Sequence, residues 1–233
     1  MKLSTKLLIG LSGILLLMIL ISAFSMKTEF EKINQKDLYW DFKKLSVKPF
    51  KHLRVIGQKA ATGKVNIIMH KNFAVNVLNT WATAVEVTNQ NDTLIVRFLA
   101  NPTRNQAEDY QTFENIVTVL CPNLNSIVGE TTTIKIDSLN QQTNLRIEAN
   151  KITTIDIKHL TVPQLDIRLD TYSNAEFWSN KSFKIDKLSA KIASGASLKM
   201  RSVYPKTFDL NASDKAIVEM NGSALKVVQS VDR

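Results

Sequence analysis

The second half of the chain repeats one pattern four times, and this repeat limits the choice of fold more than any other feature. The four units begin at Leu145, Leu165, Leu188 and Phe208, so their starts are separated by 20, 23 and 20 residues. Each unit has a run of alternating residues, a corner of small or polar residues, and a second alternating run. Period-2 alternation is typical of strands. Because so short a unit covers its apolar face only by stacking on a neighbour, the repeat predicts a β-solenoid.

The apolar positions of these units predict the core. When the units are aligned, the residues expected to stack rung on rung are Leu165, Ile167, Leu188, Ala190, Ile192, Phe208 and Leu210. Each buried aliphatic side chain stabilises the fold by roughly 1.5 to 3 kcal/mol. The small corner from Ser194 to Ser197 fits this geometry, since tight turns exclude bulky side chains and favour a residue with φ above zero. The corners in "DTYSNAEF" and "NASDKAIV" depart from this pattern, and the turn type there stays open.

The chain from Phe50 to the repeats also has the pattern of strands. Short alternating runs such as "FAVNVLN" and "DTLIVRF" are broken by Gly, Asn, Asp and Pro, as expected of an all-β domain. The exception is Asn101 to Asn115, which we interpret as a polar loop or helical turn. Cys121 alternates with Val117 and Val119, so we expect a small buried thiol rather than a reactive one.

The N-terminus carries a membrane signal. The 18 residues from Leu7 to Phe24 are uncharged and almost wholly apolar, and as a helix they span about 27 Å, close to the hydrocarbon thickness of a bilayer. This length fits an uncleaved anchor better than a cleaved signal peptide, although Ala23 and Ser25 leave cleavage open. Lys2 and Lys6 precede the span without any acid, which favours an extracytoplasmic location for the rest of the chain.

The resulting domain prediction has four parts. Residues 1–26 form a signal anchor or signal peptide, 27–44 a juxtamembrane stalk, 45–228 the β-solenoid domain, and 229–233 a C-terminal tail. If the first part remains, the domain is held at the inner membrane and lies in the periplasm. If it is cleaved, the domain is secreted or displayed at the cell surface.

The order of several short motifs resembles a known family. The run from Phe50 through "VIG", the strand "DTLIV", the turn "CPNLNSIVGE" and the coils with "SGAS" corners are together similar to the auto-transporter adhesin head domain, or GIN domain, of Bacteroidetes cell-envelope proteins. The likeness covers about Phe50 to Val228. The resemblance implies a right-handed β-helix or solenoid-like domain, secreted or anchored in the envelope, without an active site to transfer. The long apolar anchor departs from the cleaved or lipoprotein start of many relatives.

Aromatic and basic side chains supply the candidate ligand-binding residues. Alternation places Phe177 and Trp178 on opposite faces of a strand, so one of these rings faces outward or towards a loop. An outward ring stacks on a sugar while a nearby cation binds an acidic group. The full candidate set is Trp81, Phe177, Trp178, Lys181, Lys184 and Arg201. The competing interpretation is that these rings cap the core.

Catalytic and metal sites have weaker support. Three acids, Asp166, Asp170 and Glu176, are candidates for a shared face, but outward charges on a solvated strand explain them without any catalytic role. The histidines His52, His70 and His159 lack metal-ligand spacing with one another and with Cys121. No nucleophile elbow, phosphate loop or dinucleotide-binding pattern is present in the sequence. We therefore expect no enzyme activity, cofactor or metal.

The charge of the chain narrows the choice of partner. The sequence has 30 basic and 21 acidic residues, a formal charge of +9, which suits an anionic surface or an acidic polymer. The basic residues are scattered among acids and form no recognised nucleic-acid-binding motif, so we expect no nucleic-acid partner. The prediction is a non-catalytic, adhesin-like or structural module that binds a surface glycan or envelope protein and contacts the membrane through residues Leu7 to Phe24. The alternatives are a polysaccharide-active enzyme, expected to cluster two or three acids with a basic residue in one groove, and a carrier of lipid or lipopolysaccharide, expected to have an open apolar groove.

Overall fold

The structure, a computed structural model, describes residues 3–31, 37–58, 63–99, 115–178, 183–201 and 203–220, with side chains from Gly10 onward. The chain separates into two units, Met1–Asp41 and Phe42–Arg233. The predicted tail 229–233 and most of the predicted insertion Asn101–Asn115, up to residue 114, lie outside the described residues.

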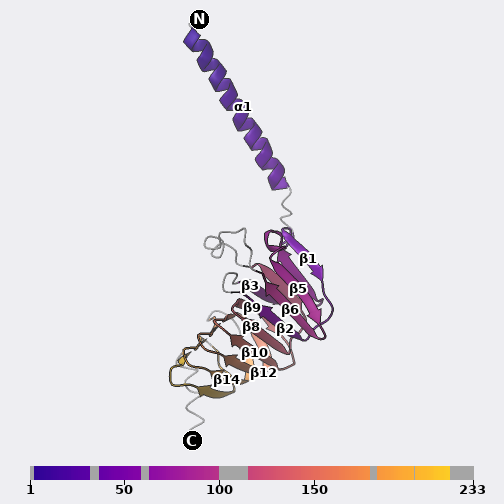
Figure 1. The fold of residues 1–233 in the computed structure, drawn as a ribbon, viewed down its shortest axis with the longest axis vertical. Helices are drawn as coiled ribbons and strands as arrows, with labels where there is room; N and C mark the ends of the chain where they lie inside the picture. Colours follow the sequence, from indigo (N-terminus) through magenta and orange to yellow (C-terminus); the bar gives the residue numbers. More distant parts are fainter. Residues whose placement is uncertain are drawn as a thin grey trace. The chain divides into compact units, whose positions relative to one another are not determined.

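The first unit contains a single long helix among its described residues, α1 (Leu3–Glu31) (Figure 1). None of its described side chains is buried, and its segment Gly10–Glu31 has the length and composition needed to cross a membrane. A signal sequence meets the same two criteria. The helix continues past the predicted apolar span into residues that we assigned to the stalk. The last three residues of that stalk, 42–44, lie in the first strand.

The second unit is built of strands. They are β1 (Phe42–Ser46), β2 (His52–Ile56), β3 (Lys64–Met69), β4 (Ala74–Leu78), β5 (Val85–Gln90), β6 (Thr93–Phe98), β7 (Val117–Cys121), β8 (Ser126–Glu130), β9 (Thr133–Asn140), β10 (Leu145–Asn150), β11 (Thr154–Ile157), β12 (Leu160–Leu169), β13 (Asn174–Phe177), β14 (Phe183–Ile192), β15 (Ser197–Met200), β16 (Thr207–Ala212) and β17 (Ile217–Met220). A short 3-10 helix, η1 (Asn79–Trp81), follows β4. The domain is therefore all-β, as predicted.

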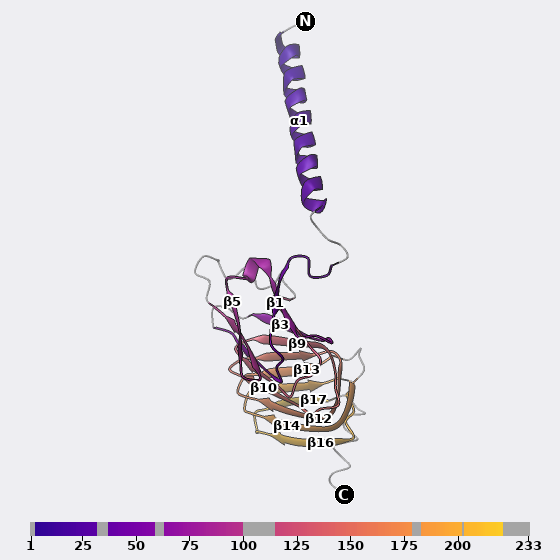
Figure 2. The ribbon, with the colours of Figure 1, turned by 90° about the vertical axis from the view of Figure 1, so that its right-hand side faces the viewer.

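The strands form two ladders, which meet where the end of β9 pairs with the start of β12 (Figures 1 and 2). From β7 onward the chain alternates between the ladders. Ladder A has the order β1, β4, β7, β3, β9, β11, β13, β15, β17. Ladder B has the order β5, β6, β2, β8, β10, β12, β14, β16. From β8 onward every pairing between successive coils is parallel. The right-handed β-helix remains a prediction of the sequence.

The predicted stacking of apolar residues is confirmed by the strand register. Leu165 pairs with Leu188, which pairs with Phe208, and the next inward row is Ile167, Ala190 and Leu210. All of these side chains are buried in a single apolar core cluster except Leu210, which is partly buried and packs against that cluster. Because each inward row continues from coil to coil, the repeats share one core.

The N-terminal part of the domain has a different pairing. β5 and β6 form a hairpin whose two-residue turn holds Asn91 at a φ of 52°, and β4 pairs antiparallel with both β1 and β7. Gly63 precedes β3 where the ring of Phe98 lies so close that a Cβ on the glycine would be 2.0 Å from it. Only glycine fits this contact between the two ladders.

The corners between the ladders answer the question of turn type. The residue two positions before each ladder A strand has positive φ in four successive coils: Thr131 (52°), Ile152 (60°), Tyr172 (60°) and Gly195 (73°). The expected glycine is thus present in one coil, and L-residues occupy the same conformation in the other three. Equivalent backbone hydrogen bonds join neighbouring corners: Thr154 N–H donates to Thr132 O at 2.9 Å, and Asn174 N–H donates to Thr153 O at 2.8 Å. These bonds stabilise the unusual conformation from coil to coil.

Candidate functional site

The predicted aromatic residues divide into buried and exposed rings. Trp81, in η1, is 4% exposed and Phe177 is fully buried, with its ring edge-on to Phe183 at 5.4 Å. Both rings belong to the core and do not present a face to a ligand. Trp178, the residue after β13, is 46% exposed. It is therefore the outward member of the predicted pair.

Of the predicted basic residues, Arg201 lies on the same ladder as Trp178. Its Nη1 atom is 3.6 Å from Glu176 Oε1, and it follows β15, the ladder A neighbour of β13. Lys184 is exposed on β14 in ladder B, where its charge acts on Asp186. Lys181 lies outside the described residues. The structure thus joins Trp178 and Arg201 on one ladder.

The outer side of ladder A carries a row of charged residues, which we call the charged row. Register pairing places its members side by side on β9, β11, β13, β15 and β17, in the order Lys135, Asp156, Glu176, Lys199 and Glu219. Neighbouring strands are about 4.8 Å apart, so opposite charges in adjacent positions attract. Lys199 and Glu219 form one such pair, at 3.7 Å.

A depression of about 380 Å³ lies along the charged row. Its second wall is the next outward row towards the corner, in which Thr154, Asn174, Ser197 and Ile217 pair in register. Trp178 and Arg201 follow Glu176 and Lys199 by two residues, so alternation places them in the outward row on the other side of the charged row. We call this face, from Asp156 to Glu219 with Trp178 and Arg201, the ladder A site.

The environment of Asp156 changes its protonation. Burial raises the pKa of this carboxyl above its usual value, because a charged carboxylate loses hydration there. Lys64 and a hydrogen bond from Trp178 act in the opposite direction, and the neighbouring Glu176 acts in the same direction as burial. Asp156 thus links the exposed tryptophan to the charged row.

This arrangement is suited to binding a polyhydroxylated ligand. An exposed indole offers an apolar face for the C–H side of a sugar ring, while carboxylates accept hydrogen bonds from hydroxyl groups and cations donate them. Sequence reasoning missed Asp156, Lys199 and Glu219. The repeat could have revealed them, because each lies at the same distance from the start of its unit as Glu176 does from the start of its own.

The predicted acid cluster does not form as one face. Asp166 is on β12 in ladder B, Asp170 is in a corner, and Glu176 is on β13 in ladder A. Ladder A instead brings Asp156 beside Glu176. A polysaccharide-active enzyme would use this pair, since adjacent strands give nearly the separation of about 5 Å used by retaining glycosidases.

The remaining titratable candidates make local contacts. His52 Nδ1 is 2.7 Å from Ser126 Oγ, and His159 Nδ1 is 2.9 Å from the carbonyl oxygen of Asp137. His70 bonds within its own turn, with the Asn72 backbone. Cys121 is buried, and burial raises its pKa to about 12, which keeps the thiol protonated. Across the described residues, no group of three or more His, Cys, Asp or Glu side chains is placed to hold a metal ion.

Comparison with known proteins identifies the fold. No family model matches the sequence, and no curated protein matches it. The chain is similar in structure to a "putative adhesin" from Bacteroides fragilis, with a TM-score of 0.50 and 13% identity, over 76% of this chain and 95% of that one. Because the identity is low, this likeness shows a shared fold alone.

Two structures from Parabacteroides distasonis align less well. One is a "putative adhesin" with a TM-score of 0.33 and 13% identity, over 77% of this chain and 96% of that one. The other is a "Putative lipid binding protein" with a TM-score of 0.32 and 8% identity, over 77% and 94%. At these scores neither likeness supports an inference about this chain.

Proposed function

We propose that this chain is a membrane-anchored, extracytoplasmic module without catalytic activity, which binds surface glycans or related surface polymers through the ladder A site. The observation that carries the proposal is the exposed ring of Trp178, which is hydrogen-bonded to Asp156 on the ladder that also carries the ion pair of Glu176 with Arg201. A regular, repeated surface of this kind suits an extended polymer, because each coil repeats the spacing of the one before. In this proposal α1 is the anchor and the domain is a right-handed β-helix of the GIN type.

The test is binding of the full-length protein, in detergent micelles, to an array of neutral and acidic envelope and host glycans at low and high salt. The variant Trp178→Ala removes the exposed ring, and Tyr204→Ala is the matched control, since Tyr204 is 50% exposed between β15 and β16. Binding to particular glycans that survives high salt, is lost in Trp178→Ala and is kept in Tyr204→Ala supports the proposal. If the protein binds every anionic glycan at low salt and none at high salt, the interaction rests on net charge alone, and this result contradicts the proposal.

A second candidate function is hydrolysis of the bound polysaccharide, favoured by the pairing of Asp156 with Glu176 and by the raised pKa of Asp156. Both carboxylates line the ladder A depression together with Lys199. Against catalysis, one of the two is already engaged, since Glu176 is ion-paired with Arg201 at 3.6 Å. Incubation with each bound glycan, followed by measurement of new reducing ends, separates the two functions. We expect no new ends. Release that stops in both Asp156→Asn and Glu176→Gln would establish the enzyme instead.

The lipid-carrier alternative has less support among the described residues. It requires an open apolar groove, whereas the depression on ladder A is bordered mainly by polar and charged side chains. The apolar side chains between the ladders form a closed, buried cluster.

A further inference from the structure

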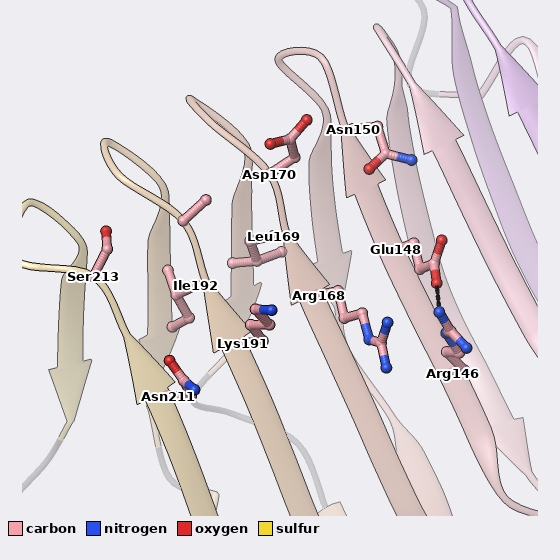
Figure 3. Close-up of a pocket in the computed structure, with 11 residues that line it drawn as sticks. Arg146, Glu148, Asn150, Arg168, Leu169, Asp170, Lys191, Ile192, Asn211 and Ser213 are labelled. Carbon is pink, nitrogen blue, oxygen red and sulfur yellow. Dashed lines mark ion pairs between the residues drawn. The ribbon is translucent and has the colours of Figure 1, made fainter.

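A second depression, of about 430 Å³, lies on ladder B, the sheet that does not carry Trp178 (Figure 3). It crosses four coils, and its charged lining comes from β10, β12 and β14 together with the corner after β12. The residues that matter to its chemistry are Arg146, Glu148, Arg168, Asp170, Lys191 and Asn211. We call this depression the ladder B groove.

Register explains how these side chains come together. Glu148 pairs with Arg168, Arg168 with Lys191, and Lys191 with Asn211, so one outward row runs along the groove. Figure 3 shows the Arg168 and Lys191 side chains on adjacent strands. Since adjacent strands are about 4.8 Å apart, two cations stand next to each other without an acid between them in the row.

The cations of the groove differ in how they are neutralised. Arg146 forms an ion pair with Glu148 (Figure 3), and Arg168 Nη2 is 3.8 Å from Asp166 Oδ2. Lys191 is exposed and has no ion-pair partner among the described residues. The ammonium group of Lys191 lies beside the guanidinium of Arg168, whose single ion pair with Asp166 is long. Together they form a site for an anionic group, because both donate charge-assisted hydrogen bonds to the same acceptor.

The acidic and amide side chains of the groove determine which other chemical groups a ligand needs. Glu148 and Asp170 would repel a uniformly anionic surface, but they accept hydrogen bonds from hydroxyl groups. Asn211 both donates and accepts. A ligand that fits has separated negative groups with hydroxyl groups between them. We infer that the ladder B groove binds an acidic oligosaccharide, with a sugar carboxylate held by Lys191 and Arg168 and sugar hydroxyls held by Glu148, Asp170 and Asn211.

This site is independent of the ladder A site, because the two lie on different ladders and share no residue. The inference therefore holds or fails separately from the proposed function. A protein with both sites would bind neutral parts of a polymer at Trp178 and acidic parts at Lys191.

The test measures binding of a galacturonic acid hexamer to the full-length protein in detergent micelles by isothermal titration, with neutral maltohexaose as the uncharged comparison. Lys191→Gln removes the unpaired charge in the groove. The matched control is Lys187→Gln, which removes the same charge from an exposed residue of the same strand outside the groove. Trp178→Ala is measured alongside.

We expect the hexamer to bind and maltohexaose to bind far more weakly. Lys191→Gln lowers the affinity about tenfold, the usual effect of one charge-assisted hydrogen bond, whereas Lys187→Gln changes it about twofold or less. Trp178→Ala leaves hexamer affinity unchanged, which separates this site from the ladder A site. Equal losses in Lys191→Gln and Lys187→Gln would assign binding to net charge and overturn the inference.

A competition experiment distinguishes a sugar carboxylate from a lipid phosphate. The soluble competitor is glycerol 3-phosphate, which carries the phosphate chemistry of a lipid headgroup. Weak competition, together with hexamer binding, supports the acidic oligosaccharide. If glycerol 3-phosphate binds in a Lys191-dependent manner and the hexamer does not, the groove is a phosphate site and the inference is wrong.

Discussion

Ile152 lies in an unfavourable backbone conformation without the burial that would offset it. Its φ is 60°, and its side chain is 67% exposed at the corner between β10 and β11. The left-handed region is difficult for β-branched residues, since the branched Cβ approaches the following carbonyl group. Asparagine tolerates this region. We therefore predict that Ile152→Asn stabilises the domain.

The size of the effect follows from two opposing terms. The left-handed conformation costs an L-residue about 1–2 kcal/mol, and most of this cost disappears with asparagine. About one third of the Ile152 side chain is covered. Full burial of an aliphatic side chain contributes about 1.5–3 kcal/mol, so replacing this one loses about 0.5–1 kcal/mol of hydrophobic stabilisation. The net gain is about 0.5–1 kcal/mol, which raises the Tm by about 1–4 °C in a domain of this size.

The assay is thermal unfolding of the full-length protein in detergent micelles, followed by the β-sheet circular dichroism signal. The control is Ile217→Asn, because Ile217 is 54% exposed but has ordinary strand geometry in β17. This control loses apolar contact and relieves no strain, so its Tm falls. If Ile152→Asn lowers the Tm as much as Ile217→Asn does, the corner conformation carries no strain and our reasoning is refuted.

Three further predictions concern the core, the ladder contact and the ladder A site. Ile192→Asp unfolds the domain, because it places a charge in the core at a cost of several kcal/mol, whereas Lys191→Asp, on the exposed face, changes the free energy of unfolding by about 0.5 kcal/mol or less. Equal effects of the two variants in urea denaturation would show that we assigned the inward and outward faces of β14 wrongly. Gly63→Ala destabilises by about 1–3 kcal/mol, because its Cβ meets the buried Phe98 ring; an unchanged urea midpoint would contradict this packing. Asp156→Asn raises the stability of the domain at neutral pH but not below pH 3.8, because the raised pKa of Asp156 means that wild-type stability is lost as the pH rises through that pKa. A gain in stability that persists in acid would show that burial of the charged carboxylate is not its cause.

The repeats were predictable because strand and corner have a constant length. Leu165 to Asn174 and Leu188 to Ser197 are both separated by nine residues, and each pair joins the same two ladders. The second unit is longer, with 23 residues. Its extra residues come after β13 and before the part of β14 that pairs with Leu165, so they do not disturb the stacking. Alignment of the starts therefore gave the inward rows correctly.

The first half of the domain was less accessible to sequence reasoning, because its pairings are distant. β2 pairs with β8, with His52 opposite Ser126, and no local pattern encodes a contact across such a separation. Antiparallel pairing of β4 with both β1 and β7 was likewise not visible in the alternation. Tertiary packing decides these partners.

The candidate site was predictable where it followed strand alternation. Alternation correctly required that Phe177 and Trp178 point to opposite sides, and burial of Phe177 selects Trp178 as the outward ring. Trp81 lies in a 3-10 helix, where the period-2 rule does not apply, and it is buried. Four non-glycine residues in the corners between the ladders have left-handed φ values: Thr131, Lys151, Ile152 and Tyr172. They were not foreseen, because glycine is the residue that adopts positive φ most readily.

The order of strands in the repeats has a consequence for how the domain folds and opens. β10 to β17 pair with strands of neighbouring coils about 20 residues away, so these contacts close short loops and lower the contact order of an all-β protein. Growth can then proceed coil by coil from any formed pair. Within the described chain, β16 and β17 pair on one side only. Their amide protons should exchange with solvent before those of β10 and β12, because the last coil opens without disturbing the others.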